Sequence, residues 1–534
     1  MRRMIILVGF LSLLILNSSG QEKSNKVDIL WGDEQKESKK TTLSDIVGHD
    51  ETGIYALKTK RKGFYGMNST ITLEHYNNKL NQTNSVSLEL IYQKKKMNFE
   101  FIIHHNNELY LYSSFINKKL NHNFLFVQTI NKKTLQFNQD IKKIAEIDYT
   151  GRSIVNIGNF NYEVSRDSSK VLVYYNLPYV RYENEQYGFH VFDEEMNQLW
   201  ENKVTLPYME ELLDVEDFKI DDKGNVHLLG VIYKEKRKAK RKGEPNYKYQ
   251  IISYFDKGNE VKEYPIMIEG KFLTDMKIAI TDDKDVICSG FYSNEGLFSI
   301  IGAYFIKVDG ETKEIIAKNF KEFGIDFITQ NMTDRQEKKA KKKAEKGKEV
   351  ELIQYDLDNI VLRDDGGAVL IGEQYFVRMV TRTMSNGNGG TTTTTSYYYF
   401  YNDIIVINIS PEGNIEWTEK IPKRQKTAND GGFYSSYAMS VVKDKLYFVF
   451  NDHPENLTYK GEGKLYNFIK SKESLIVLVE LDSNGKQTRE ALFSAREADI
   501  LTRPKVCKQI SKKEMILFGQ RRKAHRFAKI LFKE

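Results

Sequence analysis

Acidic pairs, tyrosine clusters and lysine-rich runs are the groups in this sequence that could do chemistry. Adjacent aspartates occur at 221–222, 282–283 and 364–365, and such carboxylates could bind calcium or act as general acids. They recur at the same short turn, however, where aspartate side chains satisfy nearby backbone groups. None has the alternating oxygen ligands of a calcium loop. We therefore predict a turn role for these pairs and no metal site.

No known catalytic motif accompanies these groups. The sequence contains no H-E-x-x-H, no G-x-S-x-G, no phosphate-binding glycine loop and no C-x-x-C. His104 and His105 point to opposite sides of a predicted strand and cannot hold one metal ion together. We expect the scattered histidines on the surface and in turns. The sequence thus assigns no catalytic residue and no cofactor, and it favours a protein that is not an enzyme.

Tyrosines are the stronger candidates for ligand contact. The connector 429–438 leads into a predicted innermost strand, so Tyr434 and Tyr437 are expected close to a central channel. A second group includes Tyr397 and Tyr399, in the tract Thr391–Tyr401. These rings could contact a sugar or a peptide, or they could form the cross-strand pairs that support a protruding two-stranded ribbon.

Positive charge is concentrated in two short segments, although the whole chain has a net charge of only +7. Residues 234–244 and 335–349 are both rich in lysine and arginine. A basic patch attracts anionic partners; a solvated arm that serves only solubility is the alternative. The candidate binding residues are Lys236, Arg237, Lys240 and Arg241. An envelope protein or an anionic glycan is the expected partner, with no specific nucleic-acid binding.

Alternating hairpins set the architecture that must position these residues. One type, such as 403–421 with its Pro-Glu-Gly-Asn turn, alternates with a second type, such as 360–374. Together they give four antiparallel strands per repeat. Repeats of this size built only from strands predict an all-β fold, a β-propeller of four-stranded antiparallel blades. Trp200 and Trp417 hold equivalent positions and are predicted to pack between blades.

The number of hairpins predicts the number of blades. The sequence contains eight hairpins of the second type and seven of the first, so the last unit lacks one strand. We predict eight blades, with the ring closed by the N-terminal strand 26–31, because an unpaired sheet edge is a liability. Seven blades with an irregular terminal hairpin is the alternative. Residues 21–534 then form a single domain.

Long insertions interrupt the repeats at four places. All belong to connections that are expected on the same side of the ring, so they should crowd one face. The insertions are 234–246, 324–351, 381–401 and 452–474.

The first 20 residues have the pattern of a secretory signal peptide. Two arginines precede an apolar run that is too short to span a bilayer comfortably, and small residues follow it. An uncleaved anchor is the alternative. No cysteine directly follows the run, so we predict a periplasmic or secreted protein that is not a lipoprotein and has no transmembrane span after cleavage. Cys288 and Cys507 are expected to be small buried side chains.

The C-terminal third resembles a group of exported proteins from Bacteroidota to which no activity is assigned. The resemblance rests on segments such as "YNDIIVINISPEGNIEWTEKIPKRQ" and "MILFGQRRKAHRFAKI". It implies an exported, Gram-negative context and transfers no functional residues. Within it, Ser410 and Trp417 match the Asp-box turn of sialidase-like propellers, but Glu412 replaces the aspartate.

Together these features predict a non-enzymatic binding or scaffold module at the cell envelope, acting through the insertion-bearing face. The alternative is a glycan-active hydrolase or lyase with a channel-facing acidic and tyrosine site. A fold of this type hosts both kinds of function. The sequence predicts no oligomeric state.

Overall fold

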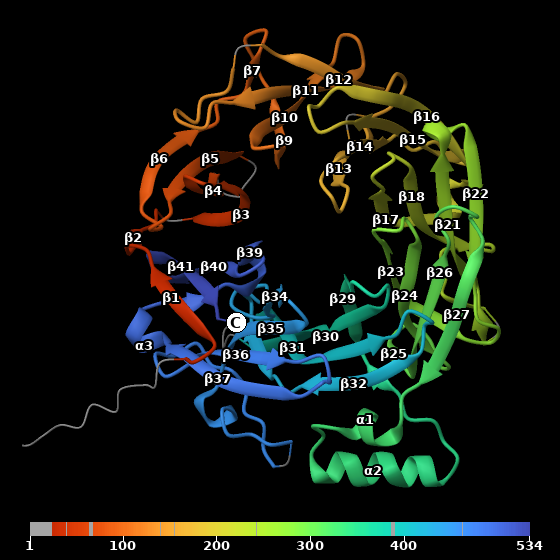
Figure 1. The fold of residues 1–534 in the computed structure, drawn as a ribbon, viewed down its shortest axis with the longest axis vertical. Helices are drawn as coiled ribbons and strands as arrows, with labels where there is room; N and C mark the ends of the chain where they lie inside the picture. Colours follow the sequence, from red (N-terminus) through yellow and green to blue (C-terminus); the bar gives the residue numbers. More distant parts are fainter. Residues whose placement is uncertain are drawn as a thin grey trace, which may run out of the picture.

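Antiparallel sheets follow one another around a ring in the computed structural model (Figure 1). The first strand of each main sheet lies nearest the centre of the ring, and the later strands lie progressively further out (Figure 1). This radial arrangement is that of blades in a β-propeller. The predicted signal peptide lies outside the described residues, which are 24–38, 40–62, 68–138, 140–153, 155–241, 243–385, 390–461 and 463–533.

The first half of the ring is built from four-stranded sheets. In chain order these sheets consist of β3 (Thr41–Asp50), β4 (Gly53–Lys62), β5 (Asn68–Asn77) and β6 (Gln82–Ser87); β9 (Asn98–His105), β10 (Glu108–Asn117), β11 (His122–Ile130) and β12 (Lys142–Asp148); β13 (Phe160–Val164), β14 (Val171–Asn176), β15 (Asn184–Phe192) and β16 (Gln198–Met209); and β17 (Leu213–Ile220), β18 (Val226–Tyr233), β21 (Tyr247–Phe255) and β22 (Glu260–Ile266).

The second half continues the pattern. Its sheets consist of β23 (Phe272–Ile280), β24 (Val286–Ser293), β26 (Gly302–Val308) and β27 (Ile315–Glu322); β29 (Tyr355–Leu362), β30 (Ala368–Ser385), β31 (Thr391–Ile409) and β32 (Ile415–Ile421), with β33 (Gln425–Ala428) beside β31; and β34 (Ala438–Val442), β35 (Lys445–Asp452), β36 (Leu475–Leu481) and β37 (Gln487–Ser494).

The last sheet combines both ends of the described chain. C-terminal strands β38 (Leu501–Thr502), β39 (Lys508–Ser511), β40 (Glu514–Arg521) and β41 (Ala524–Phe532) are joined by β1 (Val27–Trp31) and β2 (Gln35–Lys36). β1 runs antiparallel to β41, from Val27 opposite Phe532 to Trp31 opposite Ala528. The outer edge of β41 is therefore covered by a strand from the start of the chain.

Short elements occupy the connections. They are the strand pairs β7 (Ile91–Tyr92) with β8 (Lys95–Lys96), β19 (Lys240–Arg241) with β20 (Glu244–Pro245), and β25 (Ser299–Ile300) with β28 (Leu352–Ile353), and the helices α1 (Ile325–Thr329), α2 (Asp334–Glu345) and α3 (Ala495–Ala498). No helix among the described residues is long and apolar enough to cross a membrane.

Apolar faces of neighbouring sheets form the core. Ile404 on β31 and Phe448 on β35, for example, belong to one buried cluster, and each such side chain contributes about 1.5–3 kcal/mol on burial. The predicted tryptophan packing between blades is confirmed. Trp200 Nε1 donates to the Gly224 carbonyl oxygen of the next sheet at 3.2 Å, and Trp417 Nε1 donates to that of Ser483 at 2.9 Å.

β-bulges recur in the innermost strands. The register with the second strand shifts between Val215 and Asp217 in β17 and between Leu273 and Asp275 in β23. The aspartate after the bulge accepts a hydrogen bond from the next backbone N–H, as Asp275 does from Met276 at 2.8 Å. A bulge redirects side chains on one strand. The recurring bulges thus help to place carboxylates on the innermost strands.

The turn role predicted for the acidic pairs is confirmed at Asp221 and Asp365. Asp221 Oδ1 accepts from the backbone N–H groups of Lys223 and Asn225, and Asp365 Oδ1 accepts from that of Gly367. The prediction of surface histidines is wrong for His105, His227 and His525, which are at most 3% exposed. The His227 ring packs against Phe255 and the His525 ring against Phe518, and a single sequence does not show such packing.

Candidate functional site

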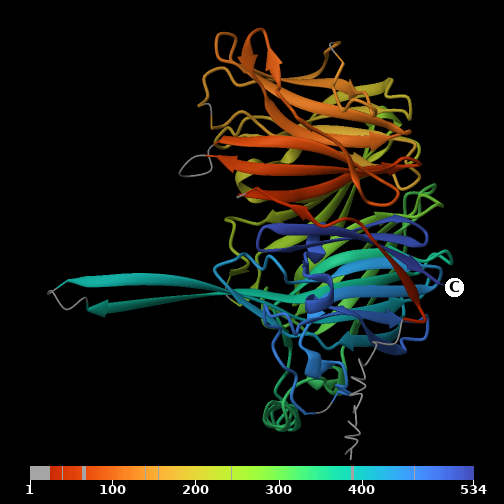
Figure 2. The same cartoon turned by 90° about the vertical axis from the view of Figure 1, so that its left-hand side faces the viewer.

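The 381–401 insertion is a two-stranded ribbon that projects far beyond the ring (Figure 2). β30 and β31 continue their pairing out to Ser385 opposite Thr391. Threonine hydroxyls bond across the ribbon, with 3.2 Å between Thr381 Oγ1 and Thr395 Oγ1. The predicted protruding ribbon is therefore confirmed, and the tract Thr391–Tyr401 supplies one of its strands.

One face of the ribbon is apolar and exposed. Tyr397 lies opposite Met379, and Tyr399 lies opposite Val377. Met379, Tyr397 and Val377 are 62%, 44% and 43% exposed, whereas Tyr399 is half-buried. These side chains line one face because alternate residues of a strand point the same way. The sequence-predicted tyrosines thus belong to an apolar stripe on the ribbon.

The root of the ribbon is braced by additional contacts. Phe376 and Phe400 stack across the two strands with ring centroids 4.4 Å apart. β33 pairs with β31 from Tyr398 to Tyr401. Lys505, from the connection before β39, donates from Nζ to the Tyr401 hydroxyl at 2.6 Å. The ribbon is therefore anchored to more than one sheet.

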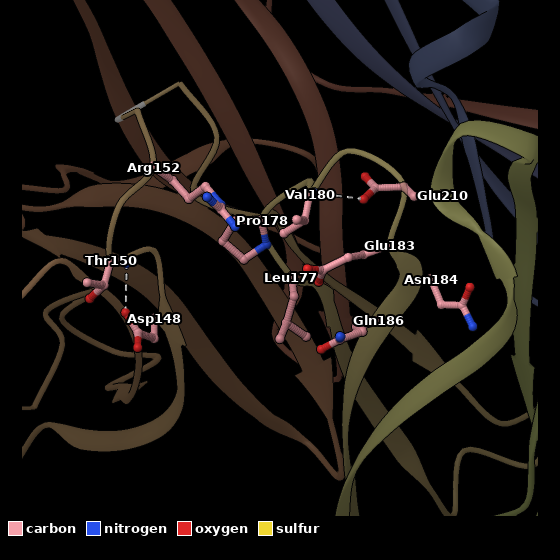
Figure 3. A pocket seen from close by; sticks show the side chains of 10 residues that line it. All are labelled: Asp148, Thr150, Arg152, Leu177, Pro178, Val180, Glu183, Asn184, Gln186 and Glu210. Atoms are coloured by element: carbon pink, nitrogen blue, oxygen red, sulfur yellow. Dashed lines mark hydrogen bonds between the residues drawn. The ribbon is translucent and has the colours of Figure 1, made fainter.

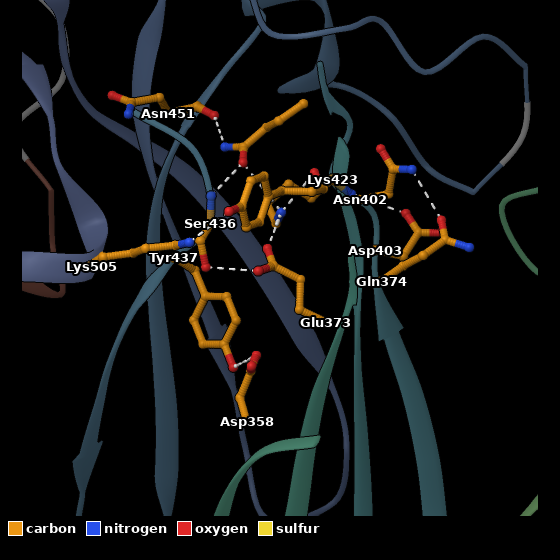
Figure 4. A network of polar contacts seen from close by, with 12 residues as sticks. Asp358, Glu373, Gln374, Asn402, Asp403, Lys423, Ser436, Tyr437, Asn451 and Lys505 are labelled. Carbon is orange, nitrogen blue, oxygen red and sulfur yellow. Dashed lines mark hydrogen bonds and ion pairs between the residues drawn. The ribbon is translucent and has the colours of Figure 1, made fainter. Parts of the chain in front are cut away.

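A buried ion pair lies beneath this root (Figure 4). Lys423 Nζ lies 2.5 Å from Glu373 Oε1, with the two side chains 0% and 4% exposed. Lys423 also donates to the Tyr401 carbonyl oxygen at 3.0 Å, and the Ser436 hydroxyl donates to Glu373 Oε2 at 2.7 Å. Because Glu373 is on β30 and Tyr401 is on β31, the network fixes both ribbon strands to the connector before β34.

Tyr437 belongs to this buried region and not to an open channel wall. Its side chain is 8% exposed, and its hydroxyl donates to Asp358 Oδ2 at 2.7 Å (Figure 4). Burial, followed by the charge of Glu373, raises the pKa of Asp358 to about 7. Asp356 is exposed at the edge of this region, where partial burial and the charges of Asp275 and Glu373 raise its pKa to about 6. This region therefore contains carboxyl groups that titrate close to neutral pH.

Tyr434 is half-buried next to Phe433, with ring centroids 5.0 Å apart. Its carbonyl oxygen accepts from Asn451 Nδ2 at 2.7 Å. The ammonium group of Lys470 lies 5.7 Å from the Tyr434 ring centroid. Of the two predicted contact tyrosines, Tyr434 is thus the more accessible.

The 234–246 segment forms the small two-stranded hairpin β19–β20, in the connection between β18 and β21. Arg237 has a structural role, because it donates to the Glu210 and Leu213 carbonyl oxygens at 2.6 and 2.7 Å and pairs with Asp214 at 2.7 Å. Lys240 is exposed and donates to the Glu295 carbonyl oxygen at 3.3 Å. Lys236 is exposed, and the Arg241 backbone belongs to β19. The basic candidates therefore lie in a different sheet from the candidate tyrosines.

The 324–351 and 452–474 insertions contact each other, since the Tyr459 hydroxyl lies 3.5 Å from Asn331 Oδ1. Both views place α2 beyond the outer edge of the ring and not over its centre (Figures 1 and 2). The ribbon projects along a different direction. The prediction that all four insertions crowd one face is therefore wrong for the ribbon and the α2 segment, which lie in different places on the ring.

A further cavity of about 190 Å³ lies between the sheets of β9–β12 and β13–β16 (Figure 3). Its polar groups serve the surrounding loops: Asp148 Oδ1 accepts from the Thr150 backbone N–H at 2.8 Å, and Glu210 Oε2 accepts from that of Val180 at 3.4 Å. Across the described parts of the chain, no cluster of three histidine, cysteine or acidic side chains is placed to hold a metal ion.

Sequence reasoning did not identify Glu373, Lys423 or Asp358. Glu373 and Lys423 are 50 residues apart, and only the ribbon pairing brings them together. The stretches "VEDF", "LTDM" and "LDNI" lie on the innermost strands at the bulge. Asp358 is the bulged residue of β29, at the position of Glu216 and Thr274, so the recurring aspartate of the innermost strands does not mark it.

No protein-family model and no curated protein matches the chain. Solved structures are similar only at low sequence identity. The WD40 domain of SCAP from fission yeast is 9% identical, with a TM-score of 0.39, and the match covers 96% of this chain and 99% of that one. The acylaminoacyl peptidase of Pyrococcus horikoshii is 9% identical with a TM-score of 0.35, covering 90% and 57%. A Synechocystis apocarotenoid oxygenase variant is 9% identical with a TM-score of 0.32, covering 96% and 94%.

Proposed function

We propose that this protein is an exported, non-enzymatic binding or scaffold module of the cell envelope, and that its β30–β31 ribbon is the principal contact element. The sheets are eight blades of one propeller, closed by β1. The observation that carries the proposal is the exposed apolar face of the ribbon, formed by Val377, Met379 and Tyr397. Contiguous exposed apolar side chains are typical of interaction sites.

The rigid root of the ribbon supports this function. A binding element that is already ordered loses less conformational entropy when its partner binds. The Glu373–Lys423 ion pair and the stacked pair Phe376–Phe400 hold the two strands in place. Arg378 and Arg382 give the ribbon positive charge, and no acidic residue occurs between Gln374 and Asn402. Because Arg378 and Arg382 alternate with Val377 and Met379, they lie on the opposite face of the ribbon. The fitting partner is therefore an acidic protein that contacts the exposed face through an apolar patch.

Export and location follow from the sequence features. The pattern of residues 1–20 and the resemblance to exported Bacteroidota proteins support a periplasmic or secreted protein. Two extended strands projecting from a ring are also well suited to reach a neighbouring envelope protein.

A pull-down from envelope extracts tests the proposal. The mature chain is compared with the double variant Met379→Ser/Tyr397→Ser, and Phe320→Ser is the control because Phe320 is an exposed apolar residue on β27, 54% exposed. The proposal expects a protein partner that the control retains and the double variant loses. A partner retained by both variants would refute the role of the ribbon.

Glycan cleavage is the second candidate function, and the near-neutral titration of Asp358 and Asp356 favours it. Carboxyl groups with raised pKa values serve as general acids in glycosidases. Incubation of the mature chain with envelope polysaccharides, with Asp356→Asn as the comparison, decides this candidate. New reducing ends or unsaturated products formed only by the wild type would establish it.

A further inference from the structure

A second recess lies outside the ribbon, where the 324–351 and 452–474 insertions meet the outer strands of two sheets. One cavity of about 400 Å³ is lined by Asn331, Lys420 and Tyr459, among others. A neighbouring cavity of about 310 Å³ also has Asn331 in its wall. The two cavities therefore lie next to each other, with the Asn331 side chain in the wall of both.

The recess is positively charged. The residues that line the larger cavity include Lys420, Lys460 and Arg489 but no aspartate or glutamate. The smaller cavity is lined by three further cations, Arg335, Arg424 and Lys464, and by a single carboxylate, Asp334. Arg489 is already neutralised, since its Nη1 lies 3.2 Å from Asp452 Oδ2.

Lys420 is an unusual buried cation. Lys420 is only 2% exposed. Nζ donates to the carbonyl oxygens of Ile328 at 3.0 Å and Gln330 at 3.5 Å, and it lies 4.9 Å from the Phe327 ring centroid. Within the described part of the chain, no carboxylate lies within 4 Å of it; the charge of the buried Asp403 carboxylate acts on it from further away and partly offsets the effect of burial on the pKa of Lys420. A lysine buried this deeply normally has an anionic partner.

Asn331 contributes an unused donor to the same recess. It is 9% exposed, and its Oδ1 lies 3.5 Å from the Tyr459 hydroxyl. Its Nδ2 amide group has no acceptor among the residues that the structure describes. A buried N–H group without a partner costs free energy, and a bound acceptor would remove that cost.

We infer that this recess binds an oxyanion group, with the Lys420 ammonium and the Asn331 amide as its principal donors. Burial lowers the pKa of Lys420 to about 8, so the amine is mostly charged at neutral pH and a bound anion would raise its pKa. The larger cavity has room for more than a free ion, and a sulfated or carboxylated sugar unit would fit the chemistry. This site lies outside the ribbon and does not depend on the proposed ribbon function.

Isothermal titration of the mature protein tests the inference. The probes are inorganic sulfate, inorganic phosphate and a sulfated disaccharide, at constant ionic strength maintained with chloride. The variants are Lys420→Met and Asn331→Asp. Asn331→Asp replaces the amide donor by a carboxylate, and an aspartate tolerates the left-handed backbone of residue 331, whose φ is 64°. The control, Lys338→Met, removes one exposed charge of α2 outside the cavities.

The inference expects saturable binding by the wild type and the control, with affinity reduced about ten-fold or more in both cavity variants, because charge-assisted hydrogen bonds are lost. Tighter binding of the disaccharide than of sulfate would identify a sugar-borne anion; equal affinities would identify a free ion. Absence of saturable binding in the wild type, or binding retained by both cavity variants, would overturn the inference. Should Lys420→Met fail to fold by circular dichroism, the near-isosteric Asn331→Asp variant decides alone.

Discussion

Removing Lys423 tests whether the buried ion pair holds the ribbon root together. Lys423→Met deletes an ammonium group that is fully buried. Glu373, which is 4% exposed, then keeps only the Ser436 hydroxyl as a side-chain donor among the described residues. Breaking a buried pair by removing one partner typically costs about 3–5 kcal/mol, because an uncompensated charge remains. We expect a loss of this size in the free energy of unfolding.

Equilibrium unfolding in guanidinium chloride measures the loss, and two comparisons sharpen it. Lys445→Met breaks an ion pair in which Lys445 is 41% exposed, and it should cost about 1 kcal/mol or less. The double variant Lys423→Met/Glu373→Gln removes both buried charges and should recover part of the lost stability. Amide hydrogen exchange in β30 and β31 should accelerate in Lys423→Met. A cost no larger than that of Lys445→Met would refute the role of the network.

Three further predictions concern the fold and its titratable groups. The pKa of Asp358 is raised from 3.8 to about 7. Its protonated form therefore stabilises the fold fully below pH about 4, and this contribution of at most about 4 kcal/mol is lost as the pH rises through 7. Asp358→Asn should flatten the profile of unfolding free energy against pH between these two values. Gly53→Ala should destabilise by about 2 kcal/mol or more, measured by thermal unfolding, because φ is 142° and a Cβ would lie 1.9 Å from the Tyr76 carbonyl oxygen. Deleting residues up to Trp31 should lower the free energy of unfolding by about 3 kcal/mol or more, because β41 loses its neighbouring strand β1. The exposed edge of β41 should also promote aggregation, which light scattering measures. Unchanged stability would contradict closure of the ring by β1.

The strand repeats could be read from the sequence because each hairpin carries local information. Alternating apolar residues and Asp, Asn or Gly turns define two strands, and the turn at Asp221 forms as those rules require. The ribbon was predictable for the same reason, since β-branched threonines and aromatic tyrosines make up most of Thr391–Tyr401. Local patterns therefore account for the sheets and for most of their connections.

The candidate site was less predictable because it depends on contacts between distant segments. Lys423 contacts Glu373 only when the ribbon strands are paired. Tyr437 is buried, and its hydroxyl donates to Asp358, which lies 79 residues earlier in the chain. Arg237 was predicted as a binding cation because it lies in a basic run, yet its guanidinium donates to the carbonyl oxygens of Glu210, before β17, and Leu213, at its start. Charge and residue type alone do not distinguish such structural cations from binding ones.

Photo-crosslinking from the ribbon tests the central claim most directly. A photoreactive residue is placed at Met379, on the exposed apolar face, and in a second protein at Phe320 on the outer strand β27. Both proteins are expressed in cells that export them and are irradiated in the intact envelope. The proposed function predicts one discrete adduct with an envelope protein from position 379 and none from position 320. No adduct from position 379, or the same adducts from both positions, would contradict a ribbon-mediated binding role.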